Sequence, residues 1–306
     1  MSEIGEDILD KSNVSNTILK ILIKIHDNIY KQINQNYVDV FLCGGASNND
    51  IYIRDSVRDN LKKIKNIRIL YPEDLFIEML YRDKQSDLLS LEKFLADNCD
   101  IICIICESPG ALVELGAFTN NDTITKVIAV IEKKREKDKS FIMLGPIKLI
   151  KKINKDNVIF YSKDNLSELS EKLKKRLIST KFKYIKAKKE ANKQSINSII
   201  GLYYFIPIIL YFFNSLELNM MITYLRYLFK ENKYKETEFD TLFRSSLKLL
   251  YKDKLIQKNI VNSNNFYKLT VKGYNTIINV LNDVNIEDKS KLYDSVRFGI
   301  ISDKYK

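Results

Sequence analysis

Histidine is almost absent from this chain, which has His26 as its single imidazole among 306 residues. A Ser-His-Asp or Cys-His site would need that one side chain to reach the nucleophile. His26 instead belongs to residues 14–33, whose apolar spacing predicts an amphipathic helix ahead of any sheet. Most nucleophilic hydrolases are therefore excluded.

Cysteine is also scarce, and all four cysteines lie in or beside apolar runs: Cys43, Cys99, Cys103 and Cys106. This is how small buried residues are used in a reducing compartment. Cys103 and Cys106 have CxxC spacing, but positions three apart in a strand point to opposite faces of the sheet. The pair is not expected to bind a metal.

The chain lacks long apolar runs and a recognisable export signal. Residues 1–10 are acidic, unlike a signal peptide. The longest apolar run, 199–213, contains Pro207 and is shorter than the roughly 20 residues of a bilayer span. We expect a cytoplasmic protein without a membrane segment, in which 199–213 is a buried helix at a domain or subunit interface.

Length and charge point to two domains and a polyanionic partner. A chain of 306 residues exceeds a typical single domain. Its formal net charge is +11, although many Lys-rich chains are basic without a specific partner.

The central stretch is DIICIICESPGALVELGAFTNN, residues 100–121. An unbroken apolar run at 101–106 predicts a strand covered on both faces. Ser108 as N-cap and Pro109 at the first helical position predict a helix to Phe118. Its N-terminal N–H groups would lie at the carboxyl edge of a parallel sheet, where they can hold a phosphate or a sugar hydroxyl.

Glu114 is the candidate catalytic residue within that helix. The positions three and four residues earlier are Ala111 and Gly110, so a substrate could approach the carboxylate closely. The alternative is an ordinary solvated glutamate on a short helix.

The flanking sequence alternates strands and helices. Strands are predicted at 38–43, 67–71, 101–106, 126–131 and 158–161, with helices at 51–64 and 86–96. This alternation predicts an α/β, three-layer, Rossmann-like domain with a parallel sheet over 37–180. Polar residues after the strands and at the helix starts are the predicted substrate-binding set: Gly44, Gly45, Arg54, Glu73, Asp74, Glu107, Ser108, Pro109 and Gly110.

These residues carry a family resemblance. The segments FLCGGA (41–46), YPEDLF (71–76), LLSLE (88–92), ESPGALVELGAFTNN (107–121) and SFIMLGPIKLIKK (140–152) resemble the effector proteins of retron anti-phage systems. Those effectors have a nucleoside deoxyribosyltransferase-like domain. The resemblance implies that Glu114, in the ELG motif, is the nucleophile, and that Asp87 has the position of a second catalytic carboxylate.

The chemistry of glycosidic cleavage agrees with this implication. A carboxylate beneath C1′ can stabilise or trap an oxocarbenium-like centre. A plain base needs a proton as it leaves, whereas the nicotinamide of NAD is already cationic. A site poor in general acids therefore favours NAD, in line with the NAD cleavage that the resemblance implies.

The second half of the chain is basic and then resembles a winged helix. A helical stretch at 166–193 is rich in lysine, and its predicted nucleic-acid-binding residues are Lys183, Lys186, Lys188 and Lys189. Helices at 216–229 and 242–251 precede strands at 254–261 and 266–270, with Arg244 and Lys248 exposed on the second helix. The alternatives are a solvated charged face and a protein-interaction module.

The sequence thus predicts five parts: an N-terminal helical segment (1–36), the deoxyribosyltransferase-like domain (37–180), a helical connector (181–215), a winged-helix domain (216–284) and a C-terminal tail (285–306). The resemblance implies a retron effector that cleaves NAD, needs no cofactor and binds the reverse transcriptase with its RNA-linked DNA. A homo-oligomer or higher assembly is expected. The alternatives are a deoxyribosyltransferase of nucleotide salvage and a nucleotide-sensing DNA-binding regulator.

Overall fold

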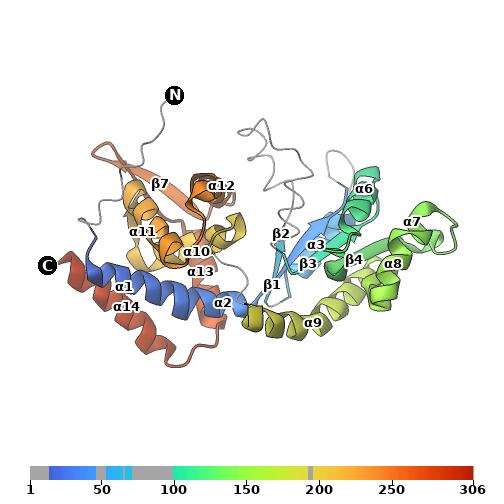
Figure 1. Cartoon of the computed structure of the whole chain (residues 1–306), viewed down its shortest axis with the longest axis horizontal. Helices are drawn as coiled ribbons and strands as arrows, with labels where there is room; N and C mark the ends of the chain where they lie inside the picture. The colour runs from blue at the N-terminus through green and yellow to red at the C-terminus, as the bar shows by residue number, and fades with distance from the viewer. Residues whose placement is uncertain (1–13, 46–52, 65, 71–98, 192–195, 306) are drawn as a thin grey trace. The chain divides into compact units, whose positions relative to one another are not determined.

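A computed structural model describes residues 14–45, 53–64, 66–70, 99–191 and 196–305, with the backbone alone over 181–191. The chain divides into two compact units. One comprises residues 37–193, and the other combines the N-terminal residues up to Asn36 with residues 194–306. Figure 1 labels the elements of both.

The unit 37–193 is built on a five-stranded parallel sheet with the order β2-β1-β3-β4-β5. This confirms the predicted α/β class. The register places Val40 opposite Ile101 and Ile105 opposite Val130. The strands are β1 (Val38–Cys43), β2 (Ile67–Leu70), β3 (Ile101–Ile105), β4 (Val127–Glu132) and β5 (Val158–Tyr161).

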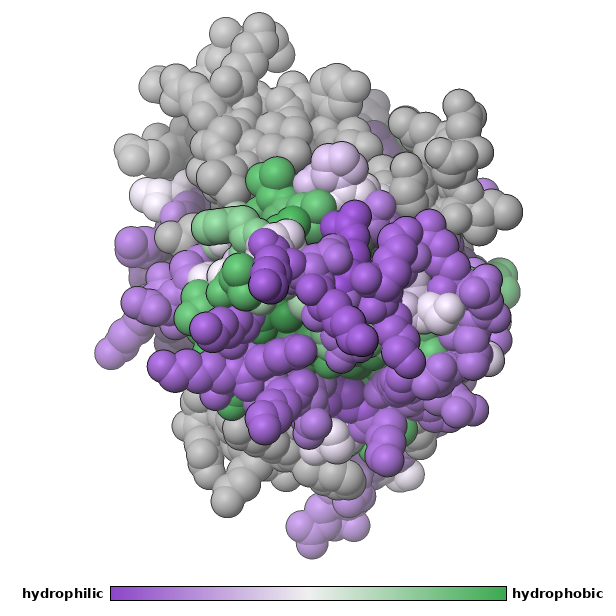
Figure 2. All heavy atoms as spheres, turned by 90° about the vertical axis from the view of Figure 1, so that its right-hand side faces the viewer, coloured by the Kyte–Doolittle hydropathy of each residue, from purple (hydrophilic) through white to green (hydrophobic). Residues whose placement is uncertain are grey.

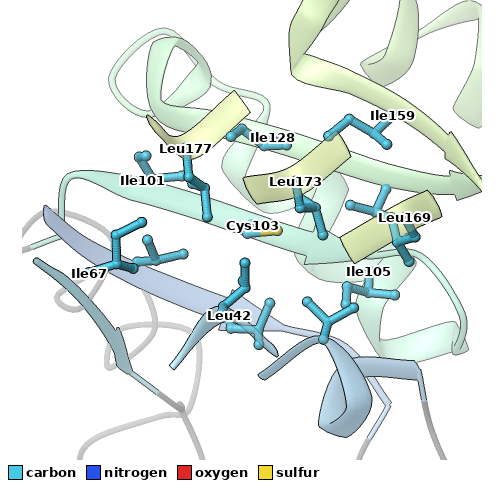
Figure 3. Packing of buried hydrophobic residues seen from close by; sticks show 14 of the residues in the cluster. Leu42, Ile67, Ile101, Cys103, Ile105, Ile128, Ile159, Leu169, Leu173 and Leu177 are labelled. Carbon is cyan, nitrogen blue, oxygen red and sulfur yellow. The ribbon is translucent and has the colours of Figure 1, made fainter. Parts of the chain in front are cut away.

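Helices cover both faces of this sheet. They are α3 (Ile53–Leu61), α6 (Pro109–Phe118), α7 (Phe141–Leu144), α8 (Pro146–Ile153) and α9 (Leu166–Ala191), with short 3₁₀ turns η3 (Ile124–Lys126), η4 (Lys133–Arg135) and η5 (Lys155–Asn157). Alternate strand residues such as Cys103 and Ile105 pack with Leu169, Leu173 and Leu177 of α9 (Figure 3). Helices α6 and α8 pack on β3 and β4. Burial on both faces explains why the central strand β3 is a continuous apolar run.

The amino end of the sheet is closed by a buried ion pair. Arg68 donates from Nε to Asp39 Oδ1 at 2.6 Å and from Nη2 to Oδ2 at 2.9 Å. The Asp39 side chain is fully buried, and its backbone N–H donates to Asp100 Oδ2 at 2.8 Å. The Arg68 guanidinium also lies 5.0 Å from the centre of the Tyr37 ring. Each charge at this end therefore has a partner.

The other unit is mainly helical. Its helices are α1 (Asn16–Lys24), the π-helical η2 (Ile25–Tyr30), α2 (Lys31–Asn36), α10 (Ile199–Phe213), α11 (Leu218–Glu231), η6 (Glu236–Glu238), α12 (Phe239–Lys252), α13 (Val271–Asp283) and α14 (Lys289–Lys304). The helix predicted at 199–213 is present and buried, and its predicted place at a domain or subunit interface stays a prediction. It packs within its own unit, against η2, α12, α13 and α14.

A small antiparallel sheet completes this unit, with the order β6-β8-β7. Its strands are β6 (Ser215–Glu217), β7 (Ile256–Val261) and β8 (Asn264–Leu269). Asn262 and Ser263 turn the β7–β8 hairpin with positive φ angles of 48° and 67°. Helix α14 lies within 285–306, where the sequence predicts only a tail. Among the described helices, none combines the length and apolarity that a bilayer span requires.

Candidate functional site

The strand order defines where a ligand can bind the α/β unit. β1 lies between β2 and β3, so the chain leaves β1 toward one side of the sheet and β3 toward the other. At such a switch point, the carboxyl ends of the two central strands flank a crevice that holds ligands in open α/β sheets. Here the two ends are Gly44-Gly45 after β1 and Glu107-Ser108 after β3. The sequence therefore brings two of its predicted clusters to one place.

Helix α6 begins as the sequence predicts. The Ala111 N–H donates to Ser108 Oγ at 3.2 Å, and Pro109 occupies the first turn. Glu114 is half-buried, and its Oε2 atom is buried. Among the described residues, a Cβ added at Gly110, one turn earlier, would meet only Ser108 Oγ, at 4.0 Å. The helix leaves room for a ligand beside the turn that carries Glu114.

Glu107 connects the carboxyl end of β3 to the start of helix α3. Its carboxylate accepts the backbone N–H of Ile53 at 2.9 Å and that of Arg54 at 3.2 Å. These are the first amides of α3, so Glu107 caps that helix from the neighbouring strand and interacts with its dipole. The sequence predicts a substrate contact at Glu107, and the contact seen in the described residues is structural.

Arg54 is buried, with 5% of its surface exposed, so it is not a solvated arginine. Its Nη1 donates to the Gly44 carbonyl oxygen at 3.3 Å. A Cβ on Gly44 would lie 3.0 Å from Arg54 Cδ and 3.1 Å from its Cβ. The glycine is therefore needed for Arg54 to pack at the end of β1. Gly45 is buried beside it.

Two protonated groups lie at the same edge. Burial raises the pKa of the Cys106 thiol to about 12; Arg135 opposes this and the negative Glu114 adds to it. Burial also raises the pKa of Tyr161 to about 12, and Glu107, Glu132 and Cys106 add to the shift while Arg135 opposes it. The Tyr161 hydroxyl and the Cys106 thiol are therefore neutral at physiological pH.

Arg135 is a candidate site residue that sequence reasoning missed. It ends η4, directly after β4, and β4 pairs with β3 up to Val130 opposite Ile105. Its charge lowers the pKa of the Cys106 thiol, and the charge of Glu114 raises the pKa of the same group. Within the described part of the chain, its guanidinium forms no hydrogen bond or ion pair. The signal in the sequence is the run Lys133-Lys134-Arg135 immediately after a buried strand.

The described part of the structure does not place the remaining predicted residues at this edge. Asp87, Glu73 and Asp74 are outside the described residues. Arg244 is exposed on α12, and Lys248 on the same helix is half-buried. The predicted lysines of the basic helix lie in the part of α9 described by its backbone alone: Lys183, Lys186, Lys188 and Lys189.

His26 belongs to the other unit, where it stacks on Tyr30 at a ring separation of 5.8 Å. Burial lowers its pKa below the usual range, against the effect of its hydrogen bond to Asp27. All four cysteines are buried and none of them forms a disulfide, which confirms their predicted burial. Among the residues that the structure describes, no group of three or more His, Cys, Asp or Glu side chains could hold a metal ion.

Comparison with known proteins gives a consistent result. The family described as STM3845 retron effector protein matches residues 50–258, more than half of the chain. A retron Ec86 protein of Escherichia coli, provisionally named a ribosyltransferase/DNA-binding protein, is 40% identical over 133 residues, which are 43% of this chain and 43% of that protein.

A second Escherichia coli protein, from retron Ec73 and with the same provisional name, is 33% identical over 118 residues, covering 36% of this chain and 37% of its own length. An uncharacterised protein, 050L, of invertebrate iridescent virus 6 is 29% identical over 177 residues, 55% of this chain and 15% of that protein. The aligned residues thus span less than half the length of each of these curated relatives.

Proposed function

Because the chain belongs to the STM3845 retron effector family, we propose that it is the enzymatic effector of a retron and cleaves the N-glycosidic bond of a nucleotide through Glu114. The observation that carries this proposal is the position of Glu114: on the helix after β3, beside the switch point, with a buried carboxylate oxygen and, among the described residues, open space at Gly110. The names of the retron relatives, which include ribosyltransferase, support the same reaction class.

The reaction follows from a carboxylate in this position. Glu114 attacks C1′ of the ribose, and the bond from C1′ to the base nitrogen breaks with its electron pair moving to that nitrogen. Water then attacks C1′ of the resulting ester, which releases the carboxylate and one proton to solvent. Burial raises the pKa of the Cys106 thiol to about 12, so this thiol stays neutral near Glu114 and adds no second negative charge to the site.

A phosphorylated substrate fits the edge best. Arg135 has no ion pair within the described residues, and the N-terminus of α6 adds a positive dipole nearby. Together they suit a diphosphate. NAD has such a diphosphate. Its nicotinamide also leaves as a neutral molecule and needs no proton from the protein. A free nucleoside would use neither feature.

The other unit supports the nucleic-acid part of the proposal. Helices α11 and α12 pack with the β6-β8-β7 sheet, and the β7–β8 hairpin projects as a wing would in a winged-helix domain. Arg244 is exposed on α12, the candidate recognition helix. We propose that this unit contacts the RNA-linked DNA of a retron and its reverse transcriptase in the cytoplasm.

The decisive experiment replaces Glu114 by glutamine, which keeps the shape of the side chain and removes its charge. Nicotinamide release from NAD is measured by chromatography on purified protein. We expect a fall of at least 10²- to 10³-fold, the approximate effect of losing a charge-stabilising group, with the melting temperature unchanged.

Glu136→Gln is the matched control, since Glu136 is an exposed carboxylate just beyond η4. It should retain the activity of the parent protein. Full nicotinamide release by the Glu114→Gln variant would refute the assignment of the nucleophile. Release of a base from nucleosides but not from NAD would instead favour a salvage enzyme.

A further inference from the structure

A basic cleft lies on the α/β unit between the edge strand β5 and helix α9. It has a volume of about 600 Å³. Four of its lining side chains are cationic and one is acidic, and a serine hydroxyl also faces it: Lys155, Lys172, Lys175, Arg176, Asp156 and Ser179. The lysine-rich stretch 166–193 supplies Lys172, Lys175 and Arg176, but the residues that the sequence predicts to bind nucleic acid lie further along it, and the sequence does not predict a cleft with β5.

Neighbouring groups fix two of the cations in place. Arg176 donates from Nε to Asn157 Oδ1 at 3.1 Å, and Asn157 itself is only 4% exposed. Lys172 Nζ lies 2.6 Å from Glu168 Oε1 and donates to the Phe160 carbonyl oxygen at 3.4 Å. Their positions are therefore preorganised, which reduces the entropy lost when an anion binds.

The other two cations carry charge that no neighbour neutralises. Lys155 and Lys175 are exposed, and within the described ranges their ammonium groups form no hydrogen bond or ion pair. Asp156 is the acidic residue of the lining. The cleft thus has a net positive potential concentrated in a concave surface, which attracts anions more strongly than a flat one.

The cleft is separate from the Glu114 site. The hydrogen bond from Arg176 to Asn157 joins α9 to the residue just before β5, so the cleft lies toward the amino end of the sheet. Glu114 and Arg135 lie beyond the carboxyl ends of β3 and β4. A substrate at Glu114 therefore does not reach the β5–α9 cleft.

The chemistry favours a phosphodiester backbone as the occupant. Residues three and four apart on a helix have Cβ atoms about 5–6 Å apart, so Lys172 neighbours both Lys175 and Arg176, and the three form a row of cations one turn long on α9. Duplex DNA carries one negative charge per about 1.7 Å of its axis, so several phosphates can engage such a row. The side of this unit that carries α7 and α8 is mostly hydrophilic, with some hydrophobic residues among the polar ones (Figure 2).

Base recognition is not provided. The aromatic residue of the lining is Phe160, and Lys151 already lies 4.7 Å from the centre of its ring. Within the lining there is no asparagine or glutamine to read a base edge. The contact would therefore be with phosphates and independent of sequence.

We propose that the β5–α9 cleft binds the phosphate backbone of a nucleic acid, so that the catalytic unit itself, and not the helical unit alone, contacts the nucleic-acid partner. This inference rests on the proposed function for the source of the nucleic acid, a retron, but not on the glycosidase reaction. It gives the catalytic unit a second site, at the end of the sheet away from Glu114.

The test uses the full chain and a fluorescein-labelled hairpin DNA with a single-stranded arm, followed by anisotropy in rising NaCl. The double variant Lys155→Gln/Lys175→Gln removes the two unneutralised charges. We expect weaker binding and a salt dependence, d log K/d log [salt], that is shallower by about 2, because each removed lysine leaves one phosphate with its counterion.

The matched control is Lys152→Gln/Lys174→Gln, which removes the same net charge from exposed positions on α8 and α9 outside the cleft lining. Its salt slope should stay close to that of the parent. Equal losses of affinity in both double variants would show diffuse attraction and overturn the proposal, as would unchanged binding in the cleft variant or no DNA binding by the parent chain.

Two further measurements separate the remaining outcomes. Inorganic triphosphate that displaces the hairpin completely at stoichiometric concentration would identify a site for a small polyphosphate and overturn the nucleic-acid proposal. Nicotinamide release should be the same in the parent and both double variants. Failure of the glycosidase assignment would appear in the parent's nicotinamide assay, whereas failure of the cleft would appear in the salt slopes.

Discussion

Arg68 at the amino end of the α/β sheet and Arg135 at its carboxyl end are in opposite situations. At the amino end, Arg68 is bound bidentately by the buried Asp39, whose backbone N–H is in turn held by Asp100. At the carboxyl end, Arg135 is half-exposed and has no hydrogen bond or ion pair among the described residues. The same residue type closes the sheet at one end and leaves charge available at the other.

This difference predicts that Arg68 contributes to the stability of the fold and Arg135 to the binding of substrate. A buried charge is tolerated only when its partners replace the water that it lost, so removing one partner is expensive. A charge near solvent needs no such partner and can interact with an anion that arrives. The amino end should therefore respond to mutation in its stability, and the carboxyl end in its affinity for substrate.

The largest expected effect is at the amino end. Asp39→Ala leaves the Arg68 guanidinium without its carboxylate in a largely buried position. We expect a loss of about 3–5 kcal/mol in the free energy of unfolding, typical of breaking a buried pair, measured by urea denaturation. The double variant Asp39→Ala/Arg68→Leu should lose less than the two single variants together. A loss below about 1 kcal/mol in Asp39→Ala would contradict the assigned role of this pair.

The next effect is at the carboxyl end. Arg135→Gln should raise KM for NAD roughly 10- to 100-fold, because a hydrogen bond to a charged group is worth about 1.5–3 kcal/mol. KM for nicotinamide riboside, which lacks the phosphates, should not change. Lys134→Gln is the control, since Lys134 is exposed and already paired with Glu132 at 2.8 Å. Equal changes for both substrates would mean that Arg135 is structural, and the contrast between the two arginines would fail.

The smallest expected effect concerns Glu107, which lies at the functional end but acts as a cap. Glu107→Gln should lower the free energy of unfolding by about 0.5–2 kcal/mol, the usual range for losing a helix cap. Hydrogen exchange at the amides of Ile53 and Arg54 should accelerate, since both N–H groups donate to this carboxylate. A raised KM without faster exchange would make Glu107 a substrate ligand, as the sequence predicts.

Local signals in the sequence were enough to predict the stretch 101–118. Its strand follows from a continuous apolar run, and its helix from Ser108 and Pro109, so every determinant lies within a few residues of the element. The strands at 38–43 and 158–161 were predicted with their observed bounds for the same reason. The α/β class followed from the alternation of such elements.

Contacts between distant residues could not be predicted in this way. Glu107 meets amides more than fifty positions earlier in the chain, and Arg68 meets Asp39 across neighbouring strands. Neither contact produces a recognisable pattern of residue spacing in the sequence. Arg135 was not predicted as a site residue because a lysine-rich loop is usually exposed to solvent without a specific function. Only the pairing of β4 with β3 places it near Glu114. The roles of Asp87, Glu73 and Asp74 stay predictions.

The strand order also bears on the sequence of events during synthesis. β2 and β3 both pair with β1, β4 pairs with β3, and β5 pairs with β4. Each strand that leaves the ribosome therefore meets an edge that has already been made. The N-terminal helix α1 is in the opposite position, because its partners α11 and α14 are translated after the whole α/β unit. The five-stranded sheet can therefore form early, whereas the helical unit, and with it the proposed contact to nucleic acid, is completed last.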